Sequence, residues 1–361
     1  MSTTTEAVEP QESVRRRRAA RPKGTRQRLS STQLIYLVLV GVIAVSIALT
    51  ANEGRNFFSQ GNIWAMFTAM SVLGLIAIGQ TLVILVGSLD LSVPYVVSLA
   101  TLIAAGGMKG LDSNVPAAIV NTLLVVALVG LVMGVLVSVF DVHGFIASLG
   151  VGLVVSGYLA TTYQGSTGSA APQLRLMGRS GIAQYVPTTF IVLLVAAALV
   201  TLMLRHTRLG HHMYAIGGNR AVARMSGVRT ALPVISAHVL CSILAGIAAL
   251  ILLSRTGVGQ PTIGSQGRYD LLSIAAVVLG GTLLAGGKGS VIGTLGGVAI
   301  FAVLDNVMGV MQVNPFLKDF IRGLVIVLAV AVYARRSVVR RPPRFGATRT
   351  SPAPTRTEVP Q

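Results

Sequence analysis

The chain has 361 residues, of which 53% are hydrophobic and only 11% are charged, and its formal net charge is +18. Because soluble domains carry roughly 25% charged residues, this composition excludes an ordinary soluble domain and indicates an integral membrane protein. The positive charges lie in two tails and one loop between apolar runs, which argues against a nucleic-acid-binding domain.

Two polar, basic tails flank the apolar part of the chain. The first, residues 1–32, contains four consecutive arginines at 15–18, and the second, residues 334–361, contains seven arginines. Neither tail has enough apolar residues to form a core. We expect both to be disordered cytoplasmic tails that set the orientation of the chain, and the first to contact anionic lipid.

Residues 33–333 are expected to form one polytopic transmembrane domain. About 20 apolar residues are needed to cross a bilayer, and about ten runs approach or reach that length. The eighth run is short and is expected to be a partial or tilted span. We therefore predict an all-α integral membrane protein with about ten transmembrane helices. The predicted spans are 33–51, two spans within 62–108, then 115–140, 145–162, 186–204, 232–253, 271–285, 290–311 and 315–333, with a Gly/Ser/Thr-rich loop at 163–185 and a polar loop at 254–270.

The distribution of Lys and Arg predicts that both termini lie in the cytoplasm. Short loops rich in these residues stay on the cytoplasmic side. With ten spans and both tails inside, 21 Lys and Arg residues fall in inner segments and 6 in outer loops. Residues 205–231 hold five arginines and no acidic residue. We therefore expect this basic loop, and whatever binds it, to be cytoplasmic.

Glycine pairs four residues apart are expected to pack helices closely. Gly130 and Gly134 form one such step, and Gly293 and Gly297 form another. In a bilayer, where no hydrophobic effect drives helices together, small residues allow close backbone contact.

The first candidate functional stretch is residues 78–93, IGQTLVILVGSLDLSV. A carboxylate in an apolar stretch is energetically expensive and marks a candidate functional residue. Asp90, with Gln80 and Ser92, is therefore a candidate for the translocation path. The alternative is structural, because an Asp followed by Leu-Ser-Val at the inner membrane edge fits the cap of a new helix.

Residues 286–289, GGKG, resemble a phosphate-binding loop only superficially. The nucleotide-binding pattern requires Gly where this chain has Thr282 and Ser or Thr where it has Gly289. We predict a tight inner turn here and no nucleotide, cofactor or metal bound by this chain. The single cysteine, Cys241, lies in an apolar run and excludes a disulfide within one chain.

The basic loop is expected to contain a short amphipathic helix. Gly217-Gly218-Asn219 ends one segment and can cap the next, which places Arg220 and Arg224 on one face, with Val222 and Met225 on another. Such a helix can fill the groove of a partner protein. The alternative is a solvated basic loop held by lipid headgroups.

A second group of polar residues lies in the last two spans. Asp305 and Asn306 lie within the ninth span, and Lys318, Asp319 and Arg322 begin the tenth. The last two are three residues apart and are expected to pair. Asp305 either pairs with Lys318 or Arg322 across the hairpin or faces a wet cavity, so Asp305 and Asn306 are candidates for structural pairing or translocation.

Four stretches, taken in order, resemble the membrane permease subunits of bacterial sugar-type ATP-binding-cassette (ABC) importers, the family of the ribose, xylose and autoinducer permeases. The resemblance spans about residues 62–332 and is specific only when the stretches are taken together. They are GQTLVILVGSLDLSV at 79–93, LGHHMYAIGGNRAVARMSGV at 209–228, residues 254–297, and NPFLKDFIRGLVIVLAV at 314–330.

The resemblance implies a multi-pass permease of the bacterial cytoplasmic (inner) membrane that translocates a monosaccharide, a pentose or hexose. It implies a homodimeric pore, two cytoplasmic ABC ATPase subunits that use the ATP, and an extracytoplasmic sugar-binding protein; the chain itself is not an enzyme. It also implies that one short segment couples the pore to the ATPases. The coupling residues would be Gly217, Gly218, Asn219, Arg220, Ala223, Arg224, Ser226 and Gly227.

The sequence departs from the usual family pattern at several positions. Ser88 and Pro94 stand where Gly is common, Ala221 where the coupling segment has Glu, and His143-Gly144 where Asn-Pro is common. The missing Glu removes one expected polar contact with the ATPase, and the changes around Asp90 leave the cargo open.

Branched-chain amino acids or nucleosides, carried by the same machinery, remain the alternative cargo. An ion-coupled secondary transporter is disfavoured because most charges lie at span ends, and no His/Asp/Glu cluster indicates a membrane enzyme.

Overall fold

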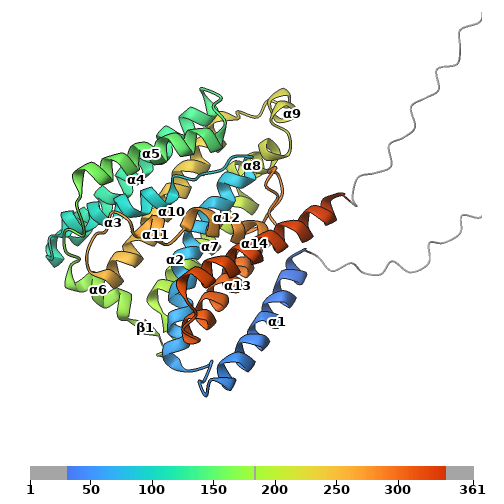
Figure 1. Cartoon of the computed structure of the whole chain (residues 1–361). Coiled ribbons are helices and arrows are strands. Elements are labelled where there is room, and N and C mark those ends of the chain that lie inside the picture. Colours follow the sequence, from blue (N-terminus) through green and yellow to red (C-terminus); the bar gives the residue numbers. More distant parts are fainter. Residues whose placement is uncertain (1–30, 183, 339–361) are drawn as a thin grey trace, which may run out of the picture. The chain divides into compact units, whose positions relative to one another are not determined.

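The computed structural model describes residues 31–182 and 184–338, and within these ranges the fold is almost entirely helical (Figure 1). Strands β1 and β2 pair antiparallel as a small hairpin. The elements in chain order are α1 (Ser31–Asn52), α2 (Gln60–Leu85), α3 (Val93–Met108), the 3-10 helix η1 (Asp112–Asn114), α4 (Val115–Ser138), α5 (Gly144–Thr162), α6 (Pro172–Arg179), β1 (Gly181–Ile182), β2 (Val186–Pro187), α7 (Thr188–His206), α8 (Arg208–Gly218), α9 (Arg220–Met225), α10 (Ala231–Thr256), α11 (Ile263–Gln266), α12 (Tyr269–Leu279), α13 (Val291–Val310) and α14 (Pro315–Val338).

The described helices account for every predicted span. In these ranges seven helices are long and apolar enough to cross a membrane, and α3 and α12 are shorter apolar helices. With α14, a helix lies at each of the ten predicted runs. The prediction of an all-α protein with multiple membrane spans is therefore confirmed. Helix α14 continues to Val338, past its predicted end at residue 333, and the rest of both predicted tails lies outside the described residues.

The loops contain short elements that the hydrophobic pattern does not predict. The segment read as a Gly/Ser/Thr-rich loop contains α6 and β1, and β2 occupies the first two residues of the predicted span 186–204, so that α7 begins at Thr188. The polar loop before α12 contains α11. Helix α6 begins with Pro172 in its first turn, where proline's missing N–H costs nothing. These elements are too short for an apolar repeat to reveal them.

Helix α2 forms the centre of the core. Every residue from Ser71 to Leu85 is buried, and the helix packs against α7, α10, α12 and α13. A helix that is apolar on all sides belongs inside a bundle. Its C-terminal end therefore carries the following turn, with Asp90, into the interior of the protein.

Glycines allow α10 to approach α4. A Cβ atom on Gly130 would lie 2.7 Å from the carbonyl oxygen of His238, and one on Gly134 would lie 2.6 Å from the Cα of Ile235. A Cβ on Gly297 would overlap the carbonyl oxygen of Ala276 in α12. The predicted close packing at both glycine steps is confirmed, and it sets α10 and α13 at their short distances from their neighbours.

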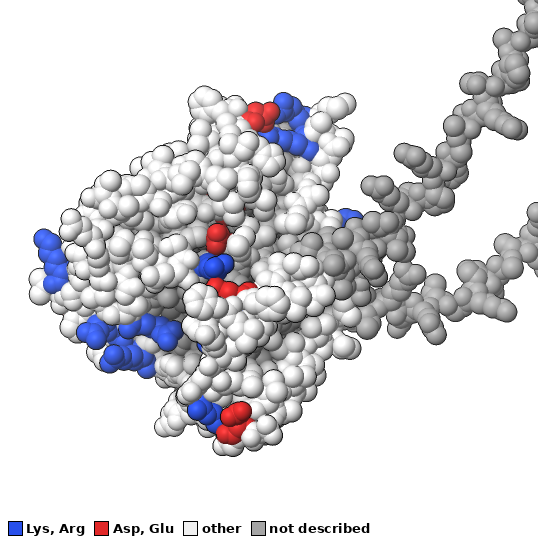
Figure 2. All heavy atoms as spheres, viewed as in Figure 1, with Lys and Arg blue, Asp and Glu red and all other residues white. Residues whose placement is uncertain are grey.

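The outward faces of several helices are apolar. Leu124 on α4, Leu153 on α5 and Leu199 on α7 each expose more than half of their surface. Figure 2 shows the charged side chains confined to a few places on an otherwise uncharged face. Apolar patches of this extent mark contact with another apolar phase, and here they are suited to lipid.

Candidate functional site

Asp90 lies in the turn between α2 and α3, and its carboxylate holds that turn. Its Oδ1 accepts a hydrogen bond from the backbone N–H of Ser92 at 2.9 Å and from the Ser92 hydroxyl at 2.5 Å. Ser92 is the N-cap residue of α3. The carboxylate thus binds the residue before the helix, and Asp90 is buried within the bundle with 1% of its surface exposed.

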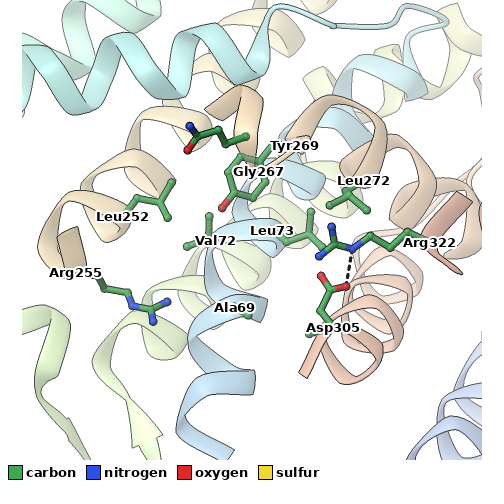
Figure 3. A pocket seen from close by; sticks show the side chains of 12 residues that line it. Ala69, Val72, Leu73, Leu252, Arg255, Gly267, Tyr269, Leu272, Asp305 and Arg322 are labelled. Carbon is green, nitrogen blue, oxygen red and sulfur yellow. Dashed lines mark hydrogen bonds and ion pairs between the residues drawn. The ribbon is translucent and has the colours of Figure 1, made fainter. Parts of the chain in front are cut away.

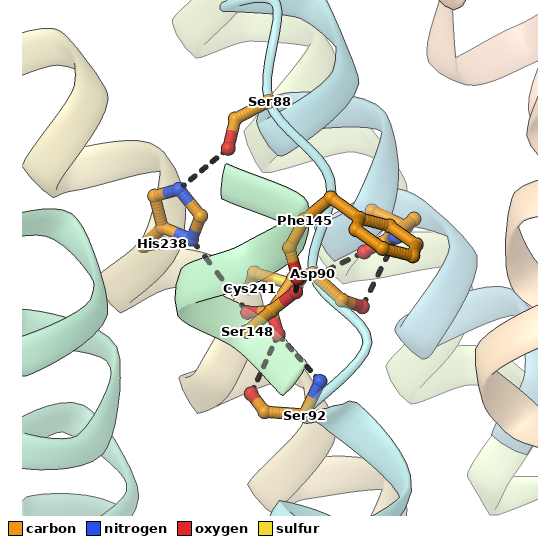
Figure 4. Close-up of polar contacts among 8 residues, drawn as sticks. Ser88, Asp90, Ser92, Phe145, Ser148, His238 and Cys241 are labelled. Carbon is orange, nitrogen blue, oxygen red and sulfur yellow. Dashed lines mark hydrogen bonds and ion pairs between the residues drawn. The ribbon is translucent and has the colours of Figure 1, made fainter. Parts of the chain in front are cut away.

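A histidine from α10 faces this turn (Figure 4). His238 is fully buried; its Nδ1 lies 3.6 Å from Asp90 Oδ2, and its Nε2 lies 3.2 Å from the Oγ of Ser88. Sequence reasoning missed His238. The signal was available, because an ionisable side chain inside an apolar span is rare unless it has a partner there.

Gln80 connects α2 to the same turn and to α10. Its Nε2 donates to the carbonyl oxygen of Asp90 at 3.2 Å, and the thiol of Cys241 lies 3.9 Å from its Oε1. Gln80, Asp90 and Ser92, singled out from the sequence, therefore meet in one buried polar cluster. Because buried polar groups are costly without partners, this cluster holds α2, the turn and α10 in one arrangement.

A junction of glycines lies where the Asp90 turn begins, at the end of α2. We call it the glycine junction: Leu85 and Gly87 at the end of α2, Gly217 at the end of α8, and Gly286 and Gly287 in the turn before α13. The N–H of Gly287 donates to the carbonyl oxygen of Leu85 at 3.0 Å. A Cβ on Gly217 would overlap that oxygen, and a Cβ on Gly286 would lie 2.9 Å from the nitrogen of Gly87. Three segments distant in sequence thus touch through their backbones.

The basic loop folds into two short helices, α8 and α9. The side chain of Asn219 accepts a hydrogen bond from the N–H of Val222 at 3.1 Å, so the predicted cap is confirmed. Gly227, with φ of +80°, ends the turn that follows α9. On α8, the Tyr214 hydroxyl donates to the carbonyl oxygen of Gly289 at 2.9 Å. Burial raises the pKa of Tyr214, so the hydroxyl keeps the proton that it donates.

Arg220 anchors α9 to the connection between α4 and α5. Its Nη1 lies 2.8 Å from Oδ1 of Asp141, and its Nη2 donates to the carbonyl oxygen of Ser138 at 3.2 Å. Asp141 has φ of +55°, a left-handed conformation that aspartate tolerates. The sequence analysis named Arg220 as a residue that couples to the ATPase. In the structure its guanidinium instead binds Asp141 and Ser138 of the same chain.

The rest of α9 points outward. Met225 is 88% exposed and Val222 56% exposed, and Arg224 and Ser226 are also exposed, whereas Ala223 is buried. An apolar pair flanked by an arginine on an exposed helix is a surface suited to a protein groove. Gly217, in contrast, is packed into the glycine junction, and Gly218 beside it has no described atom within 4 Å of where a Cβ would stand.

The second polar group lies near the end of α13. The Nε of Arg322 lies 2.7 Å from Oδ1 of Asp305 (Figure 3). The Nη1 of Arg322 lies 3.1 Å from Oδ1 of Asp319. The predicted Asp319–Arg322 pair is confirmed, and of the partners considered for Asp305 the structure selects Arg322. The Oδ1 atom of Asn306 is buried without a described partner. This group stands at the end of α13 opposite the glycine junction.

The sequence of the chain is similar to those of known transport proteins. A family model described as the permease component of a branched-chain amino acid transport system matches residues 62–330. The ribose import permease of Escherichia coli (strain K12) is 37% identical over 294 residues, which cover 80% of this chain and 91% of that protein. The ribose import permease of Bacillus subtilis (strain 168) is 33% identical over 82% of this chain and 90% of its own length. The galactose/methyl galactoside import permease of Escherichia coli (strain K12) is 30% identical over 84% and 95%. No solved structure matches the chain.

Proposed function

The chain belongs to the family of ABC importer permease components that includes the ribose and galactose import permeases, and from this premise we propose that it carries a monosaccharide across the cytoplasmic membrane. It is a multi-pass protein of that membrane. Relatives named for sugars cover most of the chain at 30–37% identity, and they favour a sugar over the amino acids in the description of the family.

The observation that carries the proposal is the glycine junction. The end of α8, immediately before the exposed helix α9, contacts the backbone atoms that begin the Asp90 turn and those that precede α13. A displacement of α8 and α9 therefore reaches the interior of the bundle directly, because no side chain lies between these backbones to absorb it. Packed segments of this kind shift between discrete arrangements.

Two cytoplasmic ATPase subunits supply the energy in this proposal. The sequence lacks the Gly-rich nucleotide-binding pattern at its one glycine-lysine loop. The exposed face of α9, with Val222, Arg224 and Met225, is where an ATPase groove would bind. A second copy of the chain would complete the pore, and an extracytoplasmic binding protein would deliver the sugar.

Coupling then proceeds through residues of this chain. When the ATPases move together, α9 moves with them. Arg220 passes the motion to the turn between α4 and α5 through Asp141, and Gly217 passes it to the Asp90 turn through Leu85. His238 holds that turn against α10, so α2, α3 and α10 move as one body.

A purification from native membranes tests this proposal. We expect an affinity-tagged chain to bring down an ATPase subunit, and the complex in liposomes to import radiolabelled ribose or galactose only with ATP and a binding protein. Sugar import by the chain alone, driven by an ion gradient, would contradict the proposal. Ligands of the binding protein, tested among pentoses, hexoses, nucleosides and branched-chain amino acids, decide the cargo.

A further inference from the structure

A cavity of about 220 Å³ lies between α2, the end of α10, α12, α13 and α14 (Figure 3). Figure 3 shows Arg255, Tyr269, Asp305 and Arg322 arranged around one space. Valine and leucine side chains from α2, Val72 and Leu73, form an apolar wall. Small-molecule sites have this composition, a mainly apolar wall with a few converging polar groups.

Ion pairs hold the polar wall of this cavity in place. Arg322 bridges Asp305 and Asp319, and Asp319 also lies 3.3 Å from the Nη2 of Arg268 at the start of α12. The network joins three helices, so Asp305 and the beginning of α12, where Tyr269 lies, are fixed relative to each other. Because Arg322 compensates the charge of Asp305, this pair adds no net charge to the wall, and Arg255 is a further donor on the lining.

A second, wider cavity shares the Asp305 side chain with the first. This cavity, of about 640 Å³, is lined by Asp305 and by amide side chains that include Asn56, Asn62 and Asn306. Its volume lies within the roughly 300–1,000 Å³ of small-molecule sites, whereas the first is smaller and suits a compact ligand. In the predicted orientation, both cavities lie on the outer side, where cargo would enter.

A purely structural ion pair does not account for this arrangement. Helix packing in a membrane favours close contact of small residues, yet here the helices leave space beside charged groups. Charged groups within a span are expensive and face a bundle interior or a wet cavity that serves transport. Asp305 takes part in an ion pair and still lines both cavities.

We propose that the 220 Å³ cavity is a binding subsite for one uncharged monosaccharide, reached through the wider cavity. Asp305 accepts hydrogen bonds from sugar hydroxyls, Arg255 donates to them, and the ring of Tyr269 covers the apolar face of the sugar. The subsite deepens the proposed function and rests on it, since it assigns a place to the sugar that the permease would carry.

Cysteine labelling tests the subsite, because the single cysteine of the chain, Cys241, is fully buried. Gln266→Cys places a thiol on the cavity wall, and Ser113→Cys places a matched thiol on an exposed residue of η1 outside both cavities. Both are made in the complete complex with its ATPase subunits. We expect ribose or galactose, near its dissociation constant, to slow labelling of the first by about twofold by occupancy alone and to leave the second unchanged.

Two variants of Tyr269 test whether the aromatic ring, as opposed to the hydroxyl, is needed for sugar binding. In the Gln266→Cys background, Tyr269→Phe keeps a ring and should retain the protection, whereas Tyr269→Leu should lose it and lower ATP-driven sugar uptake severalfold. If the unmodified complex imports sugar but no sugar slows labelling and Tyr269→Leu imports normally, the subsite is overturned and the proposed function stands. If the unmodified complex imports no monosaccharide, both fail.

Discussion

The Oγ atom of Ser88 occupies the position that a Cβ atom on residue 144 would need. Gly144 is the first residue of α5, and the same Ser88 hydroxyl contacts His238. From the resemblance to the sugar importer permeases, Gly is expected at position 88 and Pro at position 144, so both residues depart from that expectation. The serine fits because residue 144 has no side chain, so the two departures compensate for each other.

A double-mutant cycle tests this compensation. We expect Gly144→Ala to destabilise the protein by about 1–3 kcal/mol, because a methyl group is forced into a filled space. Adding Ser88→Gly should recover part of the loss, less about 1 kcal/mol for the lost hydrogen bond to His238. Thermal unfolding of the detergent-solubilised protein measures both. Gly150→Ala, on the same helix with no described atom near its Cβ position, is the control, and additive effects of the two changes would contradict the compensation.

Neighbouring glycines should differ sharply in their tolerance of a side chain. Gly217→Ala is expected to separate the backbones of the glycine junction and to lower sugar uptake at least severalfold while ATP hydrolysis continues. Gly218→Ala should leave the ratio of sugar imported to ATP hydrolysed unchanged, since its Cβ would meet no described atom. The measurement is that ratio in proteoliposomes. Equal ratios for the two variants would remove the junction from the coupling path.

The two sides of α9 should give different defects. Met225→Asp places a charge on a side chain that is 88% exposed, so folding should be unaffected and copurification of the ATPase subunit should be lost. Arg220→Gln removes the ion pair with Asp141 within the chain. It should leave ATPase binding intact and lower the sugar-to-ATP ratio. Its effect on stability should be about 1 kcal/mol, because the Asp141 side of the pair is 79% exposed to screening, whereas Arg220 is 32% exposed.

The opposite result for these variants is equally informative. If Arg220→Gln abolishes ATPase binding and Met225→Asp does not, the docking surface lies on the other side of α9. Asp141→Asn is the matched control for Arg220, because it removes the same ion pair from the partner side.

Removing one partner of the buried Asp90–His238 pair should be destabilising. His238→Leu removes the imidazole beside the buried carboxylate of Asp90 and the hydrogen bond to Ser88, and leaves buried polar atoms without a neighbour, a loss of about 1–3 kcal/mol. Asp90→Asn combined with His238→Gln leaves no unpaired charge and should cost less than the two single changes summed. Unfolding temperatures and membrane yields measure the coupling. Strict additivity would show that the two side chains do not interact.

The sequence alone was sufficient for the class of the protein and much of its layout. Long apolar runs specify spans because each must satisfy its backbone hydrogen bonds within the bilayer. The cap at Asn219 and the Asp319–Arg322 pair depend on residues three apart in one helix, and both were predicted. Local spacing was enough for these two features, because neither requires a residue from a distant part of the chain.

The buried cluster required more than local spacing. Asp90 and Gln80 were candidates from the sequence, but His238 joins them from 148 positions further along the chain than Asp90. Apolar helices carry little information about which face points inward, since lipid and core are both apolar. The partner of Asp90 therefore became visible only when α10 was packed against α2.

The order of the spans, the basic loop between two of them and the cap at Asn219 followed from the chain read residue by residue, because hydropathy, charge and capping act over one helix at a time. The meeting of Leu85, Gly217 and Gly287, and the placing of Asp305 beside two cavities, were decided by tertiary structure. Backbone contact between distant segments depends on how whole helices pack, and no repeat or spacing within any one of these segments encodes that packing.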